Sequence, residues 1–140
     1  MMSYEEKGAW VYLVATAGAY VAYVIVILSR AGDGPLSAVP YVAPMVWAIG
    51  ISIVLSIVGR IVVEIVKPSE SHKSDVRDRE INRSAQHVGG VVLAASMVVP
   101  LGLTMAEADH FWIANAIYAA LVLSALVATP LRLLAYRRGL

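Results

Sequence analysis

The chain has 140 residues, of which 59% are hydrophobic, whereas a soluble domain has about 45–50% apolar residues. The length suits one domain, residues 1–140, and the net charge of +1 gives no general attraction to nucleic acid. The absence of cysteine excludes disulfides, thiolate metal sites, iron–sulfur clusters and thiol catalysis. Because the apolar residues form long runs, the composition predicts an all-α integral membrane protein.

The first apolar run predicts a membrane-spanning helix over residues 4–29. Ser3 and Glu6 have the spacing of a capping box at its start. Because Glu5 and Glu6 precede the run and only Lys7 is basic, we expect a retained helix and not a cleaved signal peptide.

Three further helices follow along the chain. A second helix is predicted over residues 41–66, after a turn rich in glycine and proline. A third is predicted over residues 75–106, beginning as a charged extension outside the membrane and kinked at Pro100. The fourth is predicted over residues 109–137, with Asp109 as its N-cap.

The basic residues predict the orientation, because short loops rich in Lys and Arg stay in the cytoplasm. Only Arg30 lies on the outer side of this arrangement. We therefore expect a four-transmembrane-helix bundle in the plasma membrane, with the N- and C-termini and the long polar connector cytoplasmic. The basic residues on the inner side are Lys7, Arg60, Lys67, Lys73, Arg77, Arg79, Arg83, Arg132, Arg137 and Arg138.

Small residues predict how the helices pack, because helices in a bilayer associate through close contacts of small side chains. Such residues line faces of three helices, where they serve either packing within one chain or the seam of a homodimer. They are Ala15, Gly18, Ala19 and Ala22 in the first helix, Ser52, Ser56 and Gly59 in the second, and Ala116, Ala120, Ser124 and Ala128 in the fourth.

Polar residues inside the predicted spans form the first group of candidates. Arg60 and Glu64 are one turn apart near the inner end of the second helix. Charges in a membrane helix are costly and suggest function, but these two can also pair and reach the water. Arg132 is a similar case and suits an interface anchor. Asn115 lies deeper, where hydrogen bonds between helices are the commoner role.

The outer face carries a second group, in which Glu107, Asp109 and His110 lie close together in the sequence. Carboxylates with an imidazole can bind a divalent metal, but the spacing fits no metal motif. A helix cap with solvated neighbours is the simpler explanation. Arg30 shares this face and can pair with the acidic residues.

The charged extension of the third helix is the third candidate. Its opposite charges have helical spacing and can pair. A fixed charge pattern suits contact with a cytosolic or membrane protein partner, although a solvated helix end that obeys the positive-inside rule has the same composition. The candidate contact residues are Asp75, Arg77, Asp78, Arg79, Glu80 and Arg83.

Five segments of the chain resemble a family of small actinobacterial membrane proteins of unknown function. They are SYEEKGAWVYLV, VPYVAPMVWAIG, SIVGRIVVEIVKPSESHKSDVRDREI, ADHFWIANAIYAALVLSAL and LLAYRRG. The resemblance spans nearly the whole chain, and its D-x-R-D segment before the third membrane helix also resembles a wider group of membrane proteins. It implies four helices and brings no catalytic or binding residues, because the family has no assigned activity.

The sequence favours a protein that is not an enzyme. It contains no HExxH, GxSxG, Walker or Gly-rich nucleotide motif, and we expect no catalytic residues, no metal and no cofactor. Our hypothesis is a multi-pass module that acts by interaction or regulation. A small transporter or channel subunit and an accessory subunit of a larger membrane complex are the alternatives, and a transporter needs polar groups that face a cavity within the membrane.

Overall fold

Long helices make up most of the described chain. The computed structural model describes residues 4–66 and 76–138. These two ranges contain no strand and hold α1 (Tyr4–Ala31), a 3-10 turn η1 (Leu36–Ala38), α2 (Val42–Val66), α3 (Val76–Ser96), α4 (Val98–Met105) and α5 (His110–Arg138). Within the described residues, four stretches are long and apolar enough to cross a membrane, namely α1, α2, α3 with α4, and α5. The predicted all-α fold with four membrane helices is confirmed.

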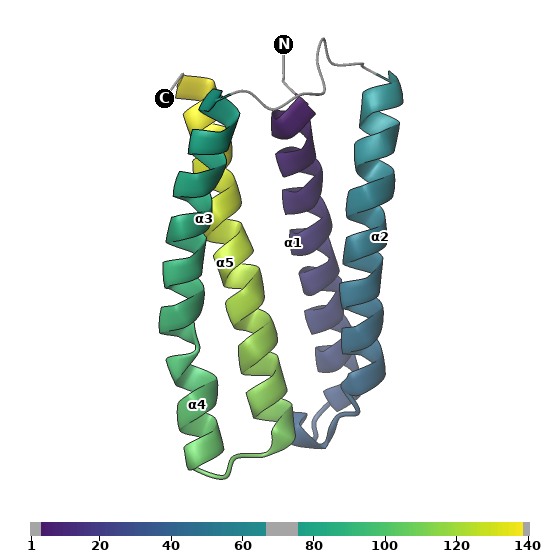
Figure 1. The fold of residues 1–140 in the computed structure, drawn as a ribbon. Helices are drawn as coiled ribbons and strands as arrows, with labels where there is room; N and C mark the ends of the chain where they lie inside the picture. The colour runs from purple at the N-terminus through teal and green to yellow at the C-terminus, as the bar shows by residue number, and fades with distance from the viewer. Residues whose placement is uncertain (1–3, 67–75, 139–140) are drawn as a thin grey trace.

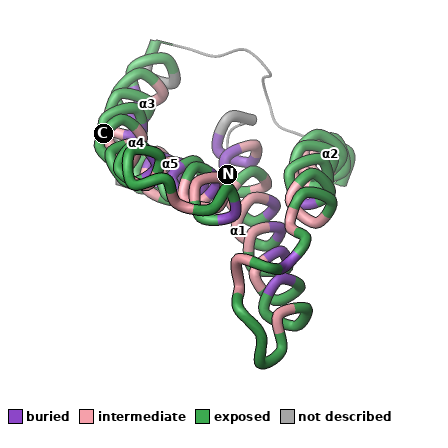
Figure 2. Tube along the Cα trace, turned by 90° about the horizontal axis from the view of Figure 1, so that it is seen from below, coloured by how far each residue is buried: buried purple, intermediate pink, exposed green. Residues whose placement is uncertain are grey.

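The helices form an open arc (Figures 1 and 2). α1 packs against α2 on one side and α5 on the other, and α3 and α4 pack against α5. No extensive packing joins the described parts of α2 and α3, which lie at the two ends of the arc. α1 begins and α5 ends at one end of the bundle, the termini end, and the turns before α2 and α5 lie at the opposite loop end. Within α2, Ala48 is the buried residue.

The third membrane span is interrupted near its proline. The break between α3 and α4 falls at Met97, one turn before Pro100. Proline has no N–H and its ring crowds the preceding turn, so the disturbance lies before the proline itself. Hydrogen bonding continues across the break, from the N–H of Met97 to the carbonyl of Leu93 (3.0 Å) and from the N–H of Leu101 to the carbonyl of Met97 (3.1 Å). α3 and α4 therefore act as one span.

A backbone motif stops α4 at the loop end. Glu107 has a φ of 56°, in the left-handed region that favours glycine. Its N–H donates to the carbonyl of Thr104 (3.1 Å), and the N–H of Ala108 donates to the carbonyl of Leu103 (2.9 Å). These are the two hydrogen bonds of a Schellman motif, in which glutamate here occupies the usual glycine position.

Aromatic residues from α1 and α5 form part of the hydrophobic core toward the loop end. Tyr23 of α1 and Phe111 and Tyr118 of α5 are buried, and Tyr118 meets Tyr20 and Tyr23 edge to face with ring centroids 5.2 Å apart in each pair. The hydroxyl of Tyr23 donates to Oδ1 of Asn115 at 2.6 Å. Asn115 therefore makes the hydrogen bond between helices that was predicted for it.

Small residues bring α3 and α5 into close contact. A Cβ at Gly89 would lie 3.0 Å from Cβ of Ala128 and 3.2 Å from Oγ of Ser124. The Ser124 hydroxyl donates to the carbonyl of Gly89 at 2.8 Å. Ala120 and Ala128 are buried, so the small-residue line of α5 serves packing within the chain.

Only part of the small-residue face predicted for α1 packs within the chain. Ala15 and Ala19 are buried, and Tyr23 continues the same line. Gly18 and Ala22 are exposed, and a Cβ at Gly18 would meet no atom within 4 Å. Because α1 packs mainly against α2 and α5, residues to the side of this line remain uncovered.

Candidate functional site

A buried ion pair ties α1 to α2 at the termini end. Nζ of Lys7 lies 3.7 Å from Oε2 of Glu64, and the two side chains are 3% and 16% exposed. A buried charge is tolerated when it is paired, so this contact fixes Glu64 toward α1. Sequence reasoning offered Arg60 as the partner of Glu64, and the structure adds Lys7 from another helix.

Arg60 crosses from α2 to the backbone of α1. A Cβ at Gly8 would lie 2.8 Å from Cζ and 2.9 Å from Nε of Arg60, so glycine leaves room for the guanidinium group. Arg60 lines a cavity of about 390 Å³ together with Gln86 of α3 and Arg132 of α5. Guanidinium groups from two helices therefore border one space.

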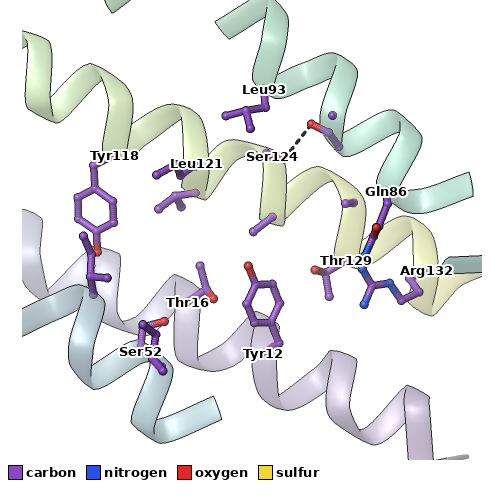
Figure 3. A pocket seen from close by; sticks show the side chains of 17 residues that line it. Tyr12, Thr16, Ser52, Gln86, Leu93, Tyr118, Leu121, Ser124, Thr129 and Arg132 are labelled. Atoms are coloured by element: carbon purple, nitrogen blue, oxygen red, sulfur yellow. Dashed lines mark hydrogen bonds between the residues drawn. The ribbon is translucent and has the colours of Figure 1, made fainter. Parts of the chain in front are cut away.

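A larger cavity of about 540 Å³ lies between α2 and α3, over α1 and α5 (Figure 3). It shares Tyr12, Gln86 and Arg132 with the smaller cavity, and the two together are the α2–α3 cleft. Its lining changes along the bundle. The termini end of the larger cavity carries Tyr12, Thr16, Gln86, Thr129 and Arg132. The part nearer the middle is mostly apolar, with Ile49, Ile53, Leu93, Leu121 and Val122 beside the hydroxyl groups of Ser52, Tyr118 and Ser124.

Several polar atoms of the cleft have no hydrogen-bond partner in the part of the chain that the structure describes. Thr129 is 1% exposed and its Oγ1 is unpartnered. Oγ1 of Thr16 and Nε of Arg132 are also buried without a partner. Figure 3 shows these side chains around one space, together with Tyr12. Since an unsatisfied buried polar group costs about 1–3 kcal/mol, the cleft holds unused hydrogen-bonding capacity.

The candidates predicted for the outer face lie at the loop end and do not assemble into one site. Oδ1 of Asp109 accepts a hydrogen bond from the N–H of Phe111 at 3.0 Å, so Asp109 caps α5 as predicted. Arg30 donates to a backbone carbonyl just before α2 at 3.5 Å, and Glu107 and His110 are exposed. Over residues 4–66 and 76–138, no three His, Asp or Glu residues are placed to hold a metal ion.

The charged segment is described in part. Asp75 lies outside the described residues, and of Arg77 and Asp78 the structure describes only the helical backbone of α3. Arg79, Glu80 and Arg83 are exposed. Ile81 and Ala85 on the same helix are buried, so the start of α3 has one packed face and one charged, open face.

Sequence reasoning identified Arg60 but missed most of the cleft. Thr16, Gln86 and Thr129 belong to three helices, and nothing in their spacing brings them together. One signal was available, because Thr16 and Thr129 place single hydroxyl groups within long apolar runs. Arg132, predicted as an interface anchor, also borders the cleft.

A four-helix membrane bundle is compatible with many activities, so the fold alone does not assign one. The chain matches no protein-family model, no curated protein and no solved structure. The α2–α3 cleft and the charged face of α3 are the features of the described chain that bear on function.

Proposed function

We propose that the chain is a non-enzymatic binding module of the plasma membrane and that the α2–α3 cleft is its binding surface. The observation that carries this proposal is Thr129, whose buried hydroxyl lacks a partner among the described residues and lines the cleft beside Arg132. Polar groups within a bilayer have no water to satisfy them, so unused ones favour the binding of another molecule. Hydroxyl, amide and guanidinium groups are suited to holding and orienting that molecule.

The charged face of α3 supports the regulatory part of the proposal. Arg79 and Arg83 are exposed on the helix that also carries Gln86 and Gly89 of the cleft. A cytosolic or membrane protein that contacts this face would touch the same rigid element as the bound molecule. Occupancy of the cleft and binding of the partner can therefore influence each other through α3.

A small transporter or channel subunit is the second candidate. The cleft extends from Arg132 at the termini end to Tyr118 in the loop-end half of α5, which is a large part of the span. Such a length suits a path as well as a binding site. Solute release from proteoliposomes distinguishes the two, because a path predicts release and a binding module predicts none.

A photo-crosslinking amino acid at Leu93 tests the binding module in intact cells. Leu93 lines the cleft, and Val21, which is 56% exposed on α1 and is not among the lining residues, is the matched control. We expect the crosslinker at Leu93 to capture one molecule of defined mass. The crosslinker at Val21 should capture only a mixture of the lipids of the bilayer. Identical mixtures from both positions would contradict the proposal.

A further inference from the structure

We infer that the α2–α3 cleft binds an anionic amphiphile, with a phosphate headgroup at the termini end and an acyl or similar chain along the apolar part. This inference rests on the proposed function and names the chemical class that the cleft takes. The occupant comes from the surrounding bilayer and enters sideways between α2 and α3, where the arc is open.

The polar end of the cleft is rich in hydrogen-bond donors. Arg60 from α2 and Arg132 from α5 line it together with Gln86 from α3. A guanidinium group only donates hydrogen bonds, and its planar fork matches two oxygens of a phosphate. Nε of Arg132 is buried without a hydrogen-bond partner in the described chain, and the buried hydroxyl of Thr129 lies next to it in the lining.

The charges at this end favour an anion. The charged residues that line the cleft are Arg60 and Arg132, and both are cationic. Glu64 is engaged with Lys7 at 3.7 Å. Neither Glu64 nor Glu6 is among the lining residues of the cleft.

The depth of Arg132 fits a lipid headgroup. α5 has 29 residues, or about 43 Å at 1.5 Å per residue, whereas the hydrocarbon core of a bilayer is about 30 Å thick. Arg132 lies about 9 Å from the end of α5 at Arg138, near the boundary between headgroups and hydrocarbon. Basic pockets between membrane helices at this level bind the phosphates of lipids.

The apolar part of the cleft selects an amphiphile over free phosphate. Ile49, Ile53, Leu93 and Leu121 continue the lining beyond the polar end. Inorganic phosphate would fill only the cationic end and leave this stretch vacant. A molecule with one charged end and one apolar chain matches both parts of the lining, which supports a lipid as the source.

Native mass spectrometry of the full-length protein in mild detergent tests this inference. The probes are phosphatidylglycerol and phosphatidylcholine with identical acyl chains, and inorganic phosphate alone. We expect a single phosphatidylglycerol to be retained, with phosphatidylcholine and inorganic phosphate bound about tenfold more weakly or worse. Arg132→Gln should remove the preference for phosphatidylglycerol.

Two variants keep this test decisive. Thr129→Val replaces the hydroxyl by a methyl group of similar size, so it should weaken retention without unfolding the bundle. Arg30→Gln removes the same charge at the loop end and should leave retention unchanged, since Arg30 is exposed in the last turn of α1 and is not among the lining residues of the cleft. Equal retention of both lipids, or a preference that survives Arg132→Gln, would overturn the anionic headgroup.

The failures of this inference and of the proposed function are distinguishable. A discrete adduct at Leu93 that proves to be an uncharged lipid, a second copy of the chain or another protein would keep the binding module and reject the anionic amphiphile. Binding of inorganic phosphate as tight as that of phosphatidylglycerol would reject the role of the apolar chain. Absence of any discrete adduct would remove both proposals.

Discussion

Lys7 and Glu64 form an ion pair between α1 and α2 at the termini end of the bundle, with Nζ and Oε2 3.7 Å apart. A second contact of α1 lies toward the opposite end. The hydrogen bond of Tyr23 to Asn115 joins α1 to α5 at 2.6 Å. α1 is thus tied to one neighbour at the termini end and to the other in the loop-end half. This arrangement fixes α1, which with α5 is one of the two inner helices of the arc and forms part of the floor of the cleft.

Replacing Glu64 by glutamine should destabilise the bundle, because the positive charge of Lys7 stays buried when the carboxylate is lost. We expect a loss of about 3 kcal/mol in the free energy of unfolding. This value is the lower end for breaking a buried ion pair, since Glu64 is partly exposed. Denaturant unfolding in detergent micelles measures the change. The double variant Lys7→Met with Glu64→Leu removes both charges and should recover most of the stability. A single variant that unfolds like the parent protein would show that the pair contributes nothing.

Adjacent glycines of α3 should respond in opposite ways to alanine. A Cβ at Gly89 would lie 3.0 Å from Cβ of Ala128, so Gly89→Ala should push α3 away from α5 and cost about 1–3 kcal/mol. A Cβ at Gly90 would meet no atom within 4 Å, so Gly90→Ala should be neutral or stabilise the helix by up to about 1 kcal/mol. Thermal unfolding of the two variants in one detergent compares them directly, and equal midpoints would contradict the close approach.

Replacing Glu107 by glycine should stabilise the turn between α4 and α5. The φ of 56° at Glu107 costs a residue with a Cβ about 1–2 kcal/mol, which glycine avoids. Part of this gain is lost because glycine is more flexible in the unfolded chain, so we expect a net gain of about 0.5–1 kcal/mol. Asp109→Ala is the control of opposite sign, since it removes the N-cap bond to Phe111 and should cost about 1 kcal/mol. A loss of stability in the glycine variant would show that the Glu107 side chain matters more than its backbone.

The helices were predictable because they depend on local patterns. Apolar runs longer than a bilayer crossing predict the four spans, and Pro100 and Asp109 predict the break in the third span and the start of α5. These features follow from residues close together in the sequence. The single interhelical bond predicted correctly, at Asn115, follows from the cost of burying an amide in a bilayer.

The cleft was not predictable, because it depends on which helices are neighbours. The sequence contains nothing that places α1 between α2 and α5 or keeps α2 away from α3. Lys7 is a typical interface residue by position, yet it is 3% exposed once α2 packs against it. Thr16 and Thr129 become a shared site only when α1 and α5 lie side by side beneath the cleft.

Orientation decides which leaflet supplies the lipid of the cleft. The termini end carries Arg60 and Arg132, and the positive-inside rule predicts that this end faces the cytoplasm. The chain has no cysteine, so single-cysteine variants give one reactive thiol each. A cysteine at Asp33, exposed in the loop-end turn, should react with an impermeant maleimide on intact cells. A cysteine at Ser71, in the connector outside the described residues, should react only after the cells are permeabilised. The opposite labelling pattern would place the arginines in the outer leaflet, and the proposed anionic lipid would then have to come from that side of the bilayer.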